Sequence, residues 1–497
     1  MLSGIPIPKD AIRPPETVLV NITPQETRVA VLEENNICEL HIERNSGHSL
    51  VGNIYLGVVR RVLPGMQSAF IDIGLERAAF LHIVDVLEQR RNPDETQRIE
   101  HMLFEGQSVL VQVIKDPINT KGARLSTQIS LAGRFLVHLP QEDHIGISQR
   151  IEDDAERNSL RERLTNLLPE DGCHGYIIRT NAENATDEQL LSDIHYLTKV
   201  WEHIQEQAKT QPPETLLYQD LPLSLRVLRD MFSLDTQKIL VDSTENHRRM
   251  TRFAEQYVHG ALGRIELFKG ERPLFETHNV EQEISRALQP RVNLNFGSYL
   301  IIESTEAMTT IDVNTGGFVG ARNFDETIFR TNLEACHTLA RELRLRNLGG
   351  IIIIDFIDMA QEAHREAVLQ ELAKALAFDR TRVTLNGFTS LGLVELTRKR
   401  SRENLSQILC EPCPSCQGRG RLKTPQTICY EIQREIVREA RRYDVQSFRI
   451  LAAPNVIDLF LDEESQSLAM LIDFIGKPIS LAVETAYTQE QYDIVLL

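Results

Sequence analysis

The sequence predicts an α/β protein built from several domains, and three observations support this fold class. The chain has 497 residues, which at roughly 150 residues per domain suggests about three domains. Short strand-like runs with glycines at their corners fill residues 52–115. Farther along, a helical stretch precedes four consecutive isoleucines, Ile351 to Ile354, which are typical of a strand buried on both faces of a sheet.

The composition argues against several classes of protein. The net charge of −17 argues against indiscriminate nucleic-acid binding, although small basic patches can still bind RNA. No apolar run approaches the roughly 20 residues of a membrane span, and residues 1–16 lack the apolar core of a signal peptide. Seven unevenly spread cysteines indicate a reducing compartment. We therefore expect a cytoplasmic protein.

The N-terminal part predicts a disordered leader, two strands (18–22 and 27–33) and then a small barrel. Four strand-like runs, at 53–62, 68–74, 77–81 and 109–115, are typical of a five-stranded barrel of the OB type. Such barrels stack aromatic side chains on single-stranded bases and hold phosphates with nearby cations. Phe70 and Phe80 are the stacking candidates, with Lys121 and Arg124 for charge. The alternative for both phenylalanines is packing in the barrel core.

A mixed region follows the barrel. Residues 122–137 are largely β, 153–168 predict a helix, and a strand at 175–178 ends at Arg179 and Thr180. A guanidinium beside a hydroxyl could bind a terminal phosphate, and a solvated arginine is the simpler interpretation. The next segments predict helices at 187–209, 224–232 and 244–257 and a strand at 238–241, without a catalytic set of residues.

Two aspartates mark the candidate reaction centre. Alternation in 307–314 places Asp312 and Asn314 on one face of a strand, and Asp355 ends the isoleucine strand. If the two strands are neighbours, their carboxylates lie close together, which is costly without a cation or a proton between them. Oxygen ligands alone suit magnesium or manganese. The alternative is that both aspartates only accept backbone N–H groups at strand ends.

The C-terminal part predicts further elements and a zinc knuckle. A helix at 361–378 and strands at 382–385 and 391–397 precede a basic run, 398–402, which is either a solvated face or an RNA contact. Residues 428–497 predict a compact α/β unit. Between them lie Cys410, Cys413 and Cys416 among Pro and Gly residues, the context of a zinc knuckle.

The cysteine knuckle is short of ligands, because a structural zinc site needs about four. No further C-x-x-C pair occurs outside residues 410–416, and Cys429 lies thirteen residues beyond Cys416, inside an expected helix. A second copy of the chain could supply the missing thiolates, two cysteines from each copy. The alternative is three free thiols in a reducing cell.

Five motifs occur in a characteristic order along the chain. They are TIDVN (310–314), NLEA (332–335), RLRNLGG (344–350), IDFIDM (354–359) and CPSCQG (413–418). In this order they resemble the ribonuclease E/G family of endoribonucleases, from about Val18 to the C-terminus. The chain ends soon after the cysteines, so we expect the short form of the family rather than the form with a long disordered C-terminal half.

The resemblance implies a domain layout. A leader (1–16) would precede an RNase H-like subdomain split between 17–46 and 222–287. Inserted in it would be an S1-type OB domain (47–126) and a 5′-sensor subdomain (127–221). A DNase I-like catalytic subdomain (288–405), a zinc link (406–422) and a small dimerisation domain (423–497) would follow. The leader is longer than the family needs.

The resemblance also implies roles for single residues. Asp312 and Asp355 would bind Mg²⁺, supported by Asn314. The implied RNA contacts are Phe70, Phe80 and Lys121, and the implied 5′-monophosphate pocket is Gly133, Val137, Arg179 and Thr180. Cys413 and Cys416 would hold a Zn²⁺ shared between two protomers of a homodimer, with Cys410 as an alternative thiol.

The function that follows is Mg²⁺-dependent endonucleolytic hydrolysis of single-stranded RNA to 5′-phosphate and 3′-hydroxyl ends. The resemblance implies a preference for 5′-monophosphorylated substrates, in maturation of ribosomal RNA and turnover of messenger RNA. Two alternatives belong to other classes: a non-catalytic RNA-binding scaffold with structural aspartates, and a metal-dependent DNase or phosphodiesterase.

Overall fold

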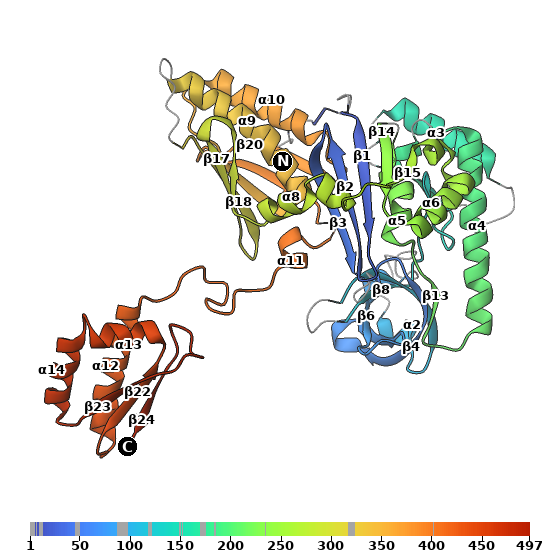
Figure 1. Ribbon diagram of the computed structural model, residues 1–497. Helices are drawn as coiled ribbons and strands as arrows, with labels where there is room; N and C mark the ends of the chain where they lie inside the picture. Colours follow the sequence, from blue (N-terminus) through green and yellow to red (C-terminus); the bar gives the residue numbers. More distant parts are fainter. Residues whose placement is uncertain are drawn as a thin grey trace. The chain divides into compact units, whose positions relative to one another are not determined.

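The computed structural model describes residues 5, 7–8, 13–44, 50–86, 98–117, 122–148, 151, 153–168, 175–182, 185–233, 235–316, 324–400 and 402–497. The chain forms two compact units, Met1–Leu405 and Ser406–Leu497. The fold is mixed α/β, as predicted, with strands and helices in both units (Figure 1). Among the described residues, no helix combines the length and apolar character needed to span a bilayer.

The first sheet joins two distant parts of the chain. Its order is β15-β14-β1-β2-β3, and β1 pairs in parallel with β14. The helix α6 (Thr244–Tyr257) packs against it through Met250 and Ala254. Its strands are β1 (Glu16–Ile22), β2 (Glu26–Glu33), β3 (Asn36–Arg44), β14 (Thr236–Val241) and β15 (Ile265–Leu267), with α5 (Leu223–Arg226) and the π-helical turn Val227–Met231 beside them.

A closed five-stranded barrel is inserted between β3 and β14, which confirms the OB-like prediction. The order is β4-β5-β6-β8-β7, and pairing of β7 with β4 closes it. A further strand, β13 (Thr215–Tyr218), pairs with β4 from outside. The barrel consists of β4 (Ile54–Leu63), β5 (Ser68–Asp72), β6 (Ala79–His82), β7 (Ser108–Lys115) and β8 (Arg124–Ser126), with the short helix α2 (Ile99–Met102).

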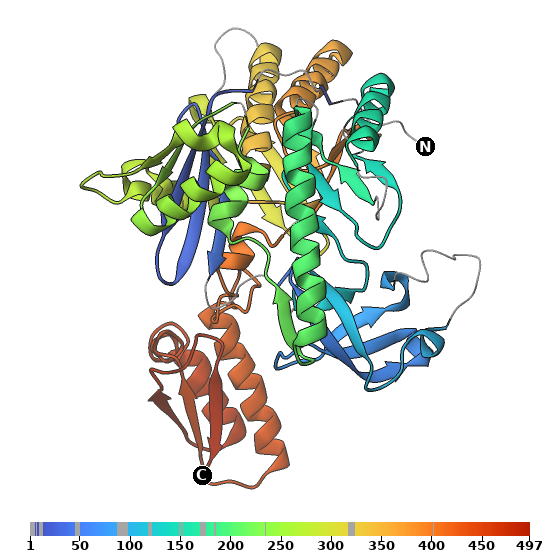
Figure 2. The same cartoon turned by 90° about the vertical axis from the view of Figure 1, so that its right-hand side faces the viewer.

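A four-stranded sheet and two helices follow the barrel. The sheet order is β11-β12-β10-β9. The 24-residue helix α4 (Asp187–Thr210) begins with a capping box between Thr186 and Gln189. It contacts both β10 and β13, the strand that pairs with the barrel strand β4, and the two views show it reaching from this sheet to the barrel (Figure 1, Figure 2). The other elements are β9 (Leu131–Ala132), β10 (Leu136–His138), β11 (Ile145–Ile147), β12 (Tyr176–Ile178) and α3 (Asp154–Leu167).

The third part of this unit is a six-stranded sheet of order β16-β17-β18-β19-β21-β20. Helices α9 (Phe324–Leu345) and α10 (Glu362–Leu376) bury one of its faces with a core that includes Leu339, Ile354 and Leu372. The strands are β16 (Arg291–Asn293), β17 (Tyr299–Ser304), β18 (Met308–Asn314), β19 (Gly350–Asp355), β20 (Val383–Phe388) and β21 (Val394–Arg398).

The isoleucine strand departs from the prediction. Ile352 and Ile354 are fully buried under the helices, but Ile351 is 48% exposed and Ile353 is half-buried. The prediction that both faces are buried was therefore wrong, because the helices cover only one face of the sheet. The other, open face carries Asp312 and Asp355.

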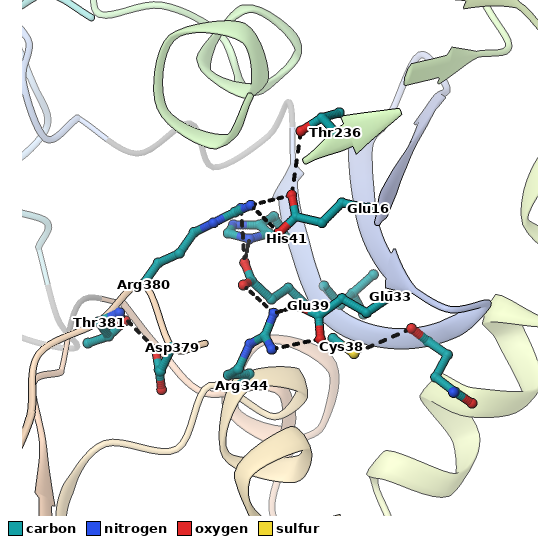
Figure 3. Close-up of polar contacts among 12 residues, drawn as sticks. Glu16, Glu33, Cys38, Glu39, His41, Thr236, Arg344, Asp379, Arg380 and Thr381 are labelled. Atoms are coloured by element: carbon teal, nitrogen blue, oxygen red, sulfur yellow. Dashed lines mark hydrogen bonds and ion pairs between the residues drawn. The ribbon is translucent and has the colours of Figure 1, made fainter. Parts of the chain in front are cut away.

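A buried ion cluster joins the first sheet to the six-stranded sheet (Figure 3). Arg344, near the end of α9, donates to Glu33 and Glu39, the latter at 3.0 Å. Arg380, after α10, donates to both carboxylate oxygens of Glu16 at 2.8 and 2.7 Å. These charged hydrogen bonds fix the two sheets against each other and so support the strands that carry the aspartates.

The second unit has its own core, and it contains the compact α/β unit that the sequence predicts. Its sheet order is β23-β22-β24, and its core includes Ile432, Phe448 and Phe460. The elements are α12 (Pro425–Arg442), β22 (Phe448–Ala452), α13 (Pro454–Leu461), α14 (Ser465–Ile475), β23 (Ile479–Val483) and β24 (Tyr492–Leu496). The RNase H-like and DNase I-like assignments, and the domain boundaries, stay predictions.

Candidate active site and substrate contacts

Asp312 and Asp355 are register partners on neighbouring parallel strands. Asp312 lies on β18 and pairs with Asp355, the last residue of β19. Register partners point to the same face of a sheet, and both aspartates are exposed on the open face. The structure therefore brings the two carboxylates together, as the sequence predicted from the strand pattern.

The electrostatics of this pair are unfavourable without a cation. Partial burial raises the pKa of Asp355, and the carboxylates of Asp312 and Asp358 raise it further. Among the described residues, no guanidinium or ammonium group offsets this shift. Asp358, in the loop after β19, is a third acidic neighbour to which sequence reasoning assigned no role. Two carboxylates that raise the pKa of a third, with no cation among the described residues to lower it, are an arrangement that favours a divalent metal.

Two asparagine side chains and one glycine turn position the aspartates. Asn314 donates from Nδ2 to Oδ2 of Asp312 at 2.8 Å. Behind the loop after β19, the buried Asn332 of α9 donates to the Ile357 carbonyl and accepts from its N–H. The turn after β18 needs glycine, because Gly316 has φ +60° and a Cβ there would lie 2.2 Å from the Gly297 carbonyl oxygen.

The donor set suits a hard cation. The two carboxylates supply oxygen ligands without His or Cys, the kind of ligand that magnesium prefers, and the Asn314 amide supports one of them. Within the described residues, no three His, Cys, Asp or Glu side chains form a metal site by themselves. Magnesium usually keeps several waters or takes substrate phosphate oxygens, so a two-carboxylate site is compatible with it.

The barrel places the two phenylalanines at its surface. Phe70 on β5 and Phe80 on β6 are register partners, with ring centroids 6.1 Å apart in an edge-to-face arrangement. Both are half-buried and lie outside the buried barrel core, so the core-packing alternative loses support. Arg124 is engaged by the buried Asp85 through an ion pair of 2.7 Å. Lys121 lies outside the described residues.

Gly133 belongs to a loop that a buried carboxylate organises. Asp193 of α4 accepts the backbone N–H groups of Arg134, Phe135 and Leu136 at 3.1, 2.8 and 2.8 Å. A Cβ at Gly133 would meet this carboxylate at 2.5 Å, so the position requires glycine. Burial raises the pKa of Asp193, although the three N–H groups oppose this.

The other predicted sensor residues lie in the same sheet. Val137 is on β10, which pairs with β12, and Arg179 and Thr180 follow β12. The Arg179 guanidinium donates to the Gly133 carbonyl and forms a 2.7 Å ion pair with Asp230. The structure thus brings Gly133, Val137 and Arg179 into one region, with the arginine held by a carboxylate that sequence reasoning missed.

The cysteine turn precedes α12 in the second unit. Cys410 and Cys413 are exposed, Cys416 is half-buried, and all three are free thiols. Backbone N–H groups of Cys416 and Ser415 lower the pKa of the Cys413 thiol, which favours the thiolate that zinc binds. Cys429 is fully buried in the core of this unit and is unavailable as a ligand.

Comparison with known proteins places the chain in a family. A family model described as Ribonuclease E/G family matches residues 130–401. Ribonuclease G of Escherichia coli (strain K12) is 48% identical over 487 residues, which cover 97% of this chain and 99% of that protein. The chain belongs to the ribonuclease E/G family.

Other relatives in the ribonuclease E/G family agree with this assignment. Ribonuclease G of Haemophilus influenzae is 47% identical over 97% of this chain and 99% of its own length. Ribonuclease E of Nostoc sp. is 40% identical over 80% of this chain, but the match covers 58% of that longer protein. Family membership confirms the resemblance that the five motifs indicated.

Sequence reasoning assigned no role to three acidic residues near these sites, Asp230, Asp193 and Asp358. Asp193 lies on the buried side of α4, and its contacts cross 57 to 59 residues of sequence. Asp230 lies on a helical turn 51 residues from Arg179. Asp358 could have been found, since it follows Asp355 by three residues in the IDFIDM motif.

Proposed function

We propose that this protein is an Mg²⁺-dependent endoribonuclease that hydrolyses single-stranded RNA. The observation that carries the proposal is the register pairing of Asp312 with Asp355 on an open sheet face, in a chain of the ribonuclease E/G family. Two relatives are named ribonuclease G and ribonuclease E. RNA processing and decay is accordingly the role we propose, with ribosomal RNA precursors and messenger RNA as substrates.

In this proposal Asp312 and Asp355 hold Mg²⁺ through their carboxylates. When bound, the metal supplies Lewis-acid polarisation of the scissile phosphate and lowers the pKa of an attacking water. Asn314 keeps the Asp312 carboxylate oriented through its 2.8 Å hydrogen bond. Water attacks phosphorus, the bond from phosphorus to the 3′-oxygen breaks, and the products carry a 5′-phosphate and a 3′-hydroxyl.

In this proposal the barrel accounts for the preference of the enzyme for single-stranded RNA. Phe70 and Phe80 present two half-exposed rings side by side, and unpaired bases can stack on such rings. A duplex keeps its bases stacked on each other and offers no free face. We propose that Lys121 adds a phosphate contact.

The preference for a 5′-monophosphate is assigned to Arg179 and the loop at Gly133. A guanidinium is a donor that can bind a terminal phosphate, and the Gly133 carbonyl accepts a hydrogen bond from that of Arg179. Thr180 and Val137 complete this pocket in the proposal. The ion pair between Arg179 and Asp230 means that a phosphate must compete with a carboxylate for the guanidinium.

A zinc ion shared between two protomers is proposed for the cysteine turn. Cys413 and Cys416 supply two thiolates from each chain, which makes the four ligands of a structural site. Cys410 remains the alternative thiol, because it is exposed and lies three residues before Cys413.

The test of the reaction uses matched RNA and DNA oligonucleotides of one sequence, with wild type and Asp355→Asn. We expect Mg²⁺-dependent internal cleavage of the RNA by wild type, and loss of roughly a hundred- to a thousandfold in rate for the variant, since each 1.36 kcal/mol of barrier is tenfold. Binding of RNA without cleavage would support the scaffold alternative. Faster cleavage of the DNA would support a DNase.

A further inference from the structure

The open face of the six-stranded sheet is acidic, although its proposed substrate is a polyanion. On these strands, residues alternate between the core and the open face, and the open face carries Glu303, Asp312, Asp355 and Glu395. Arg291, on the edge strand β16, is the only Lys or Arg on this face within the six strands, all of whose residues are described. On these six β-strands, Arg291 is therefore the one cationic side chain on the face that RNA approaches.

Arg291 lies in one row with the aspartates. Its register partner on β17 is Ile301, the partner of Ile301 on β18 is Asp312, and the partner of Asp312 is Asp355. Neighbouring strands are about 4.8 Å apart, so the Arg291 backbone is roughly 10 Å from that of Asp312. The Arg291 side chain can therefore reach a nucleotide that neighbours the aspartates.

Two contacts hold the Arg291 guanidinium in place and leave its two terminal nitrogens available as donors. Its Cζ lies 3.8 Å from the ring centroid of Tyr299, and its Nε donates to Oδ1 of Asn293 at 3.0 Å. Among the described residues, no carboxylate oxygen lies within 4.0 Å of it. The two terminal nitrogens of an exposed, oriented guanidinium are therefore available to an incoming anion.

Tyr299 connects this arginine to the reaction centre. It is half-buried and is the register partner of Asn314, the residue that orients Asp312. A stacked pair of arginine and tyrosine is the kind of platform on which an unpaired base packs. Structural stabilisation of the β16–β17 hairpin is the simpler role for a stacked arginine and tyrosine at an exposed site.

We propose that Arg291, stacked on Tyr299, is a substrate-binding residue that contacts the nucleotide next to the scissile phosphate. The guanidinium donates to a phosphate oxygen, and the stacked pair supports the base. This assignment rests on the proposed function and adds a positive contact to a face that otherwise repels RNA. It predicts an effect on RNA binding that a purely structural arginine does not have.

The experiment compares Arg291→Gln with Arg330→Gln, a matched control. Arg330 is an exposed arginine of α9 that already pairs with Glu326 at 2.8 Å. Cleavage of a 5′-monophosphorylated RNA gives KM and kcat, and fluorescence anisotropy without Mg²⁺ gives the dependence of RNA affinity on salt. For Arg291→Gln we expect KM to rise about tenfold with kcat nearly unchanged, and the salt slope to fall by about 0.7, which corresponds to one phosphate contact on a single strand.

Conservative variants separate charge from stacking. Arg291→Lys should keep the wild-type salt slope, because the charge remains, and Tyr299→Phe should keep both KM and slope. Tyr299→Leu should raise KM. If Arg291→Gln lowers the melting temperature but matches Arg330→Gln in KM and slope, the arginine is structural and the inference is wrong. Absence of RNA cleavage by wild type would instead contradict the proposed function, while the anisotropy measurement still decides the role of Arg291.

Discussion

Asp230 holds the Arg179 guanidinium in a 2.7 Å ion pair at the edge of the predicted 5′-phosphate pocket. Burial opposes ionisation of Asp230, but the guanidiniums of Arg229 and Arg179 lower its pKa below the usual value, so the carboxylate is charged at neutral pH. A terminal phosphate must therefore displace this carboxylate or share the guanidinium with it.

This competition predicts opposite effects for the two partners. Arg179→Ala should reduce the preference for 5′-monophosphate over 5′-hydroxyl RNA by about 1.5–3 kcal/mol, the value of a charged hydrogen bond. Asp230→Asn should increase the preference, because the competing charge is gone. The measurement is the ratio of kcat/KM for the two RNAs. Equal loss of rate on both RNAs for Arg179→Ala would show that Arg179 is not a sensor.

The acidic neighbours of Asp355 predict a shift in the pH–rate profile. Asp355 must lose its proton to bind a metal, and Asp312 and Asp358 raise its pKa, so activity should rise with pH through that raised value. Asp358→Asn removes one repelling charge and should move the acidic limb of kcat/KM to lower pH. Glu366→Gln, which changes an exposed carboxylate on α10, is the control. If the acidic limb of kcat/KM lies at the same pH for Asp358→Asn and Glu366→Gln, the prediction is wrong.

The buried ion cluster predicts loss of stability in acid. His41 adjoins this cluster, because its Nε2 lies 3.3 Å from Oε2 of Glu39. Burial, together with the Arg402 guanidinium, lowers the pKa of His41 to about 4. Because the unfolded chain then binds the extra proton between about pH 6.5 and 4, stability should fall by roughly 3 kcal/mol as the pH drops through this window. Glu39, whose pKa is also lowered by Arg380 and Arg344 despite its burial, adds to the loss below about pH 4.5.

Urea unfolding at several pH values measures this predicted loss of stability in acid. In His41→Gln, the free energy of unfolding should depend less on pH between pH 6.5 and 4. His203→Gln, at an exposed position on α4, should leave this pH dependence unchanged. A wild-type protein whose stability is constant across the window would contradict the assignment to His41.

The cysteine turn predicts a metal-dependent dimer. Chelation of zinc, or Cys413→Ser, should convert dimers to monomers in light scattering, because two thiolates per chain cannot complete a site alone. Ser415→Ala, in the same turn but without a thiol, should stay dimeric. Cys410→Ser decides whether the third thiol takes part. A chelated protein that remains dimeric would rule out the shared site.

Sequence reasoning succeeded where the signal is local. Strict alternation around Asp312 and the run before Asp355 predicted two strands with aspartates, and glycine-cornered strands predicted the barrel. It failed where tertiary packing decides. The strand β3 (Asn36–Arg44) was missed, and the open face over Ile351 depends on which side α9 and α10 cover. Asp193 and Asp230 contact residues more than 50 positions away, which no local pattern reveals.

The central claim is that Asp312 and Asp355 form the reaction centre. Its most direct test is incubation of an internally labelled, 5′-monophosphorylated single-stranded RNA with wild type and with Asp312→Asn, each with and without Mg²⁺. The account predicts internal cleavage only for wild type with Mg²⁺. Equal cleavage by wild type and Asp312→Asn would contradict it and would place the reaction centre elsewhere.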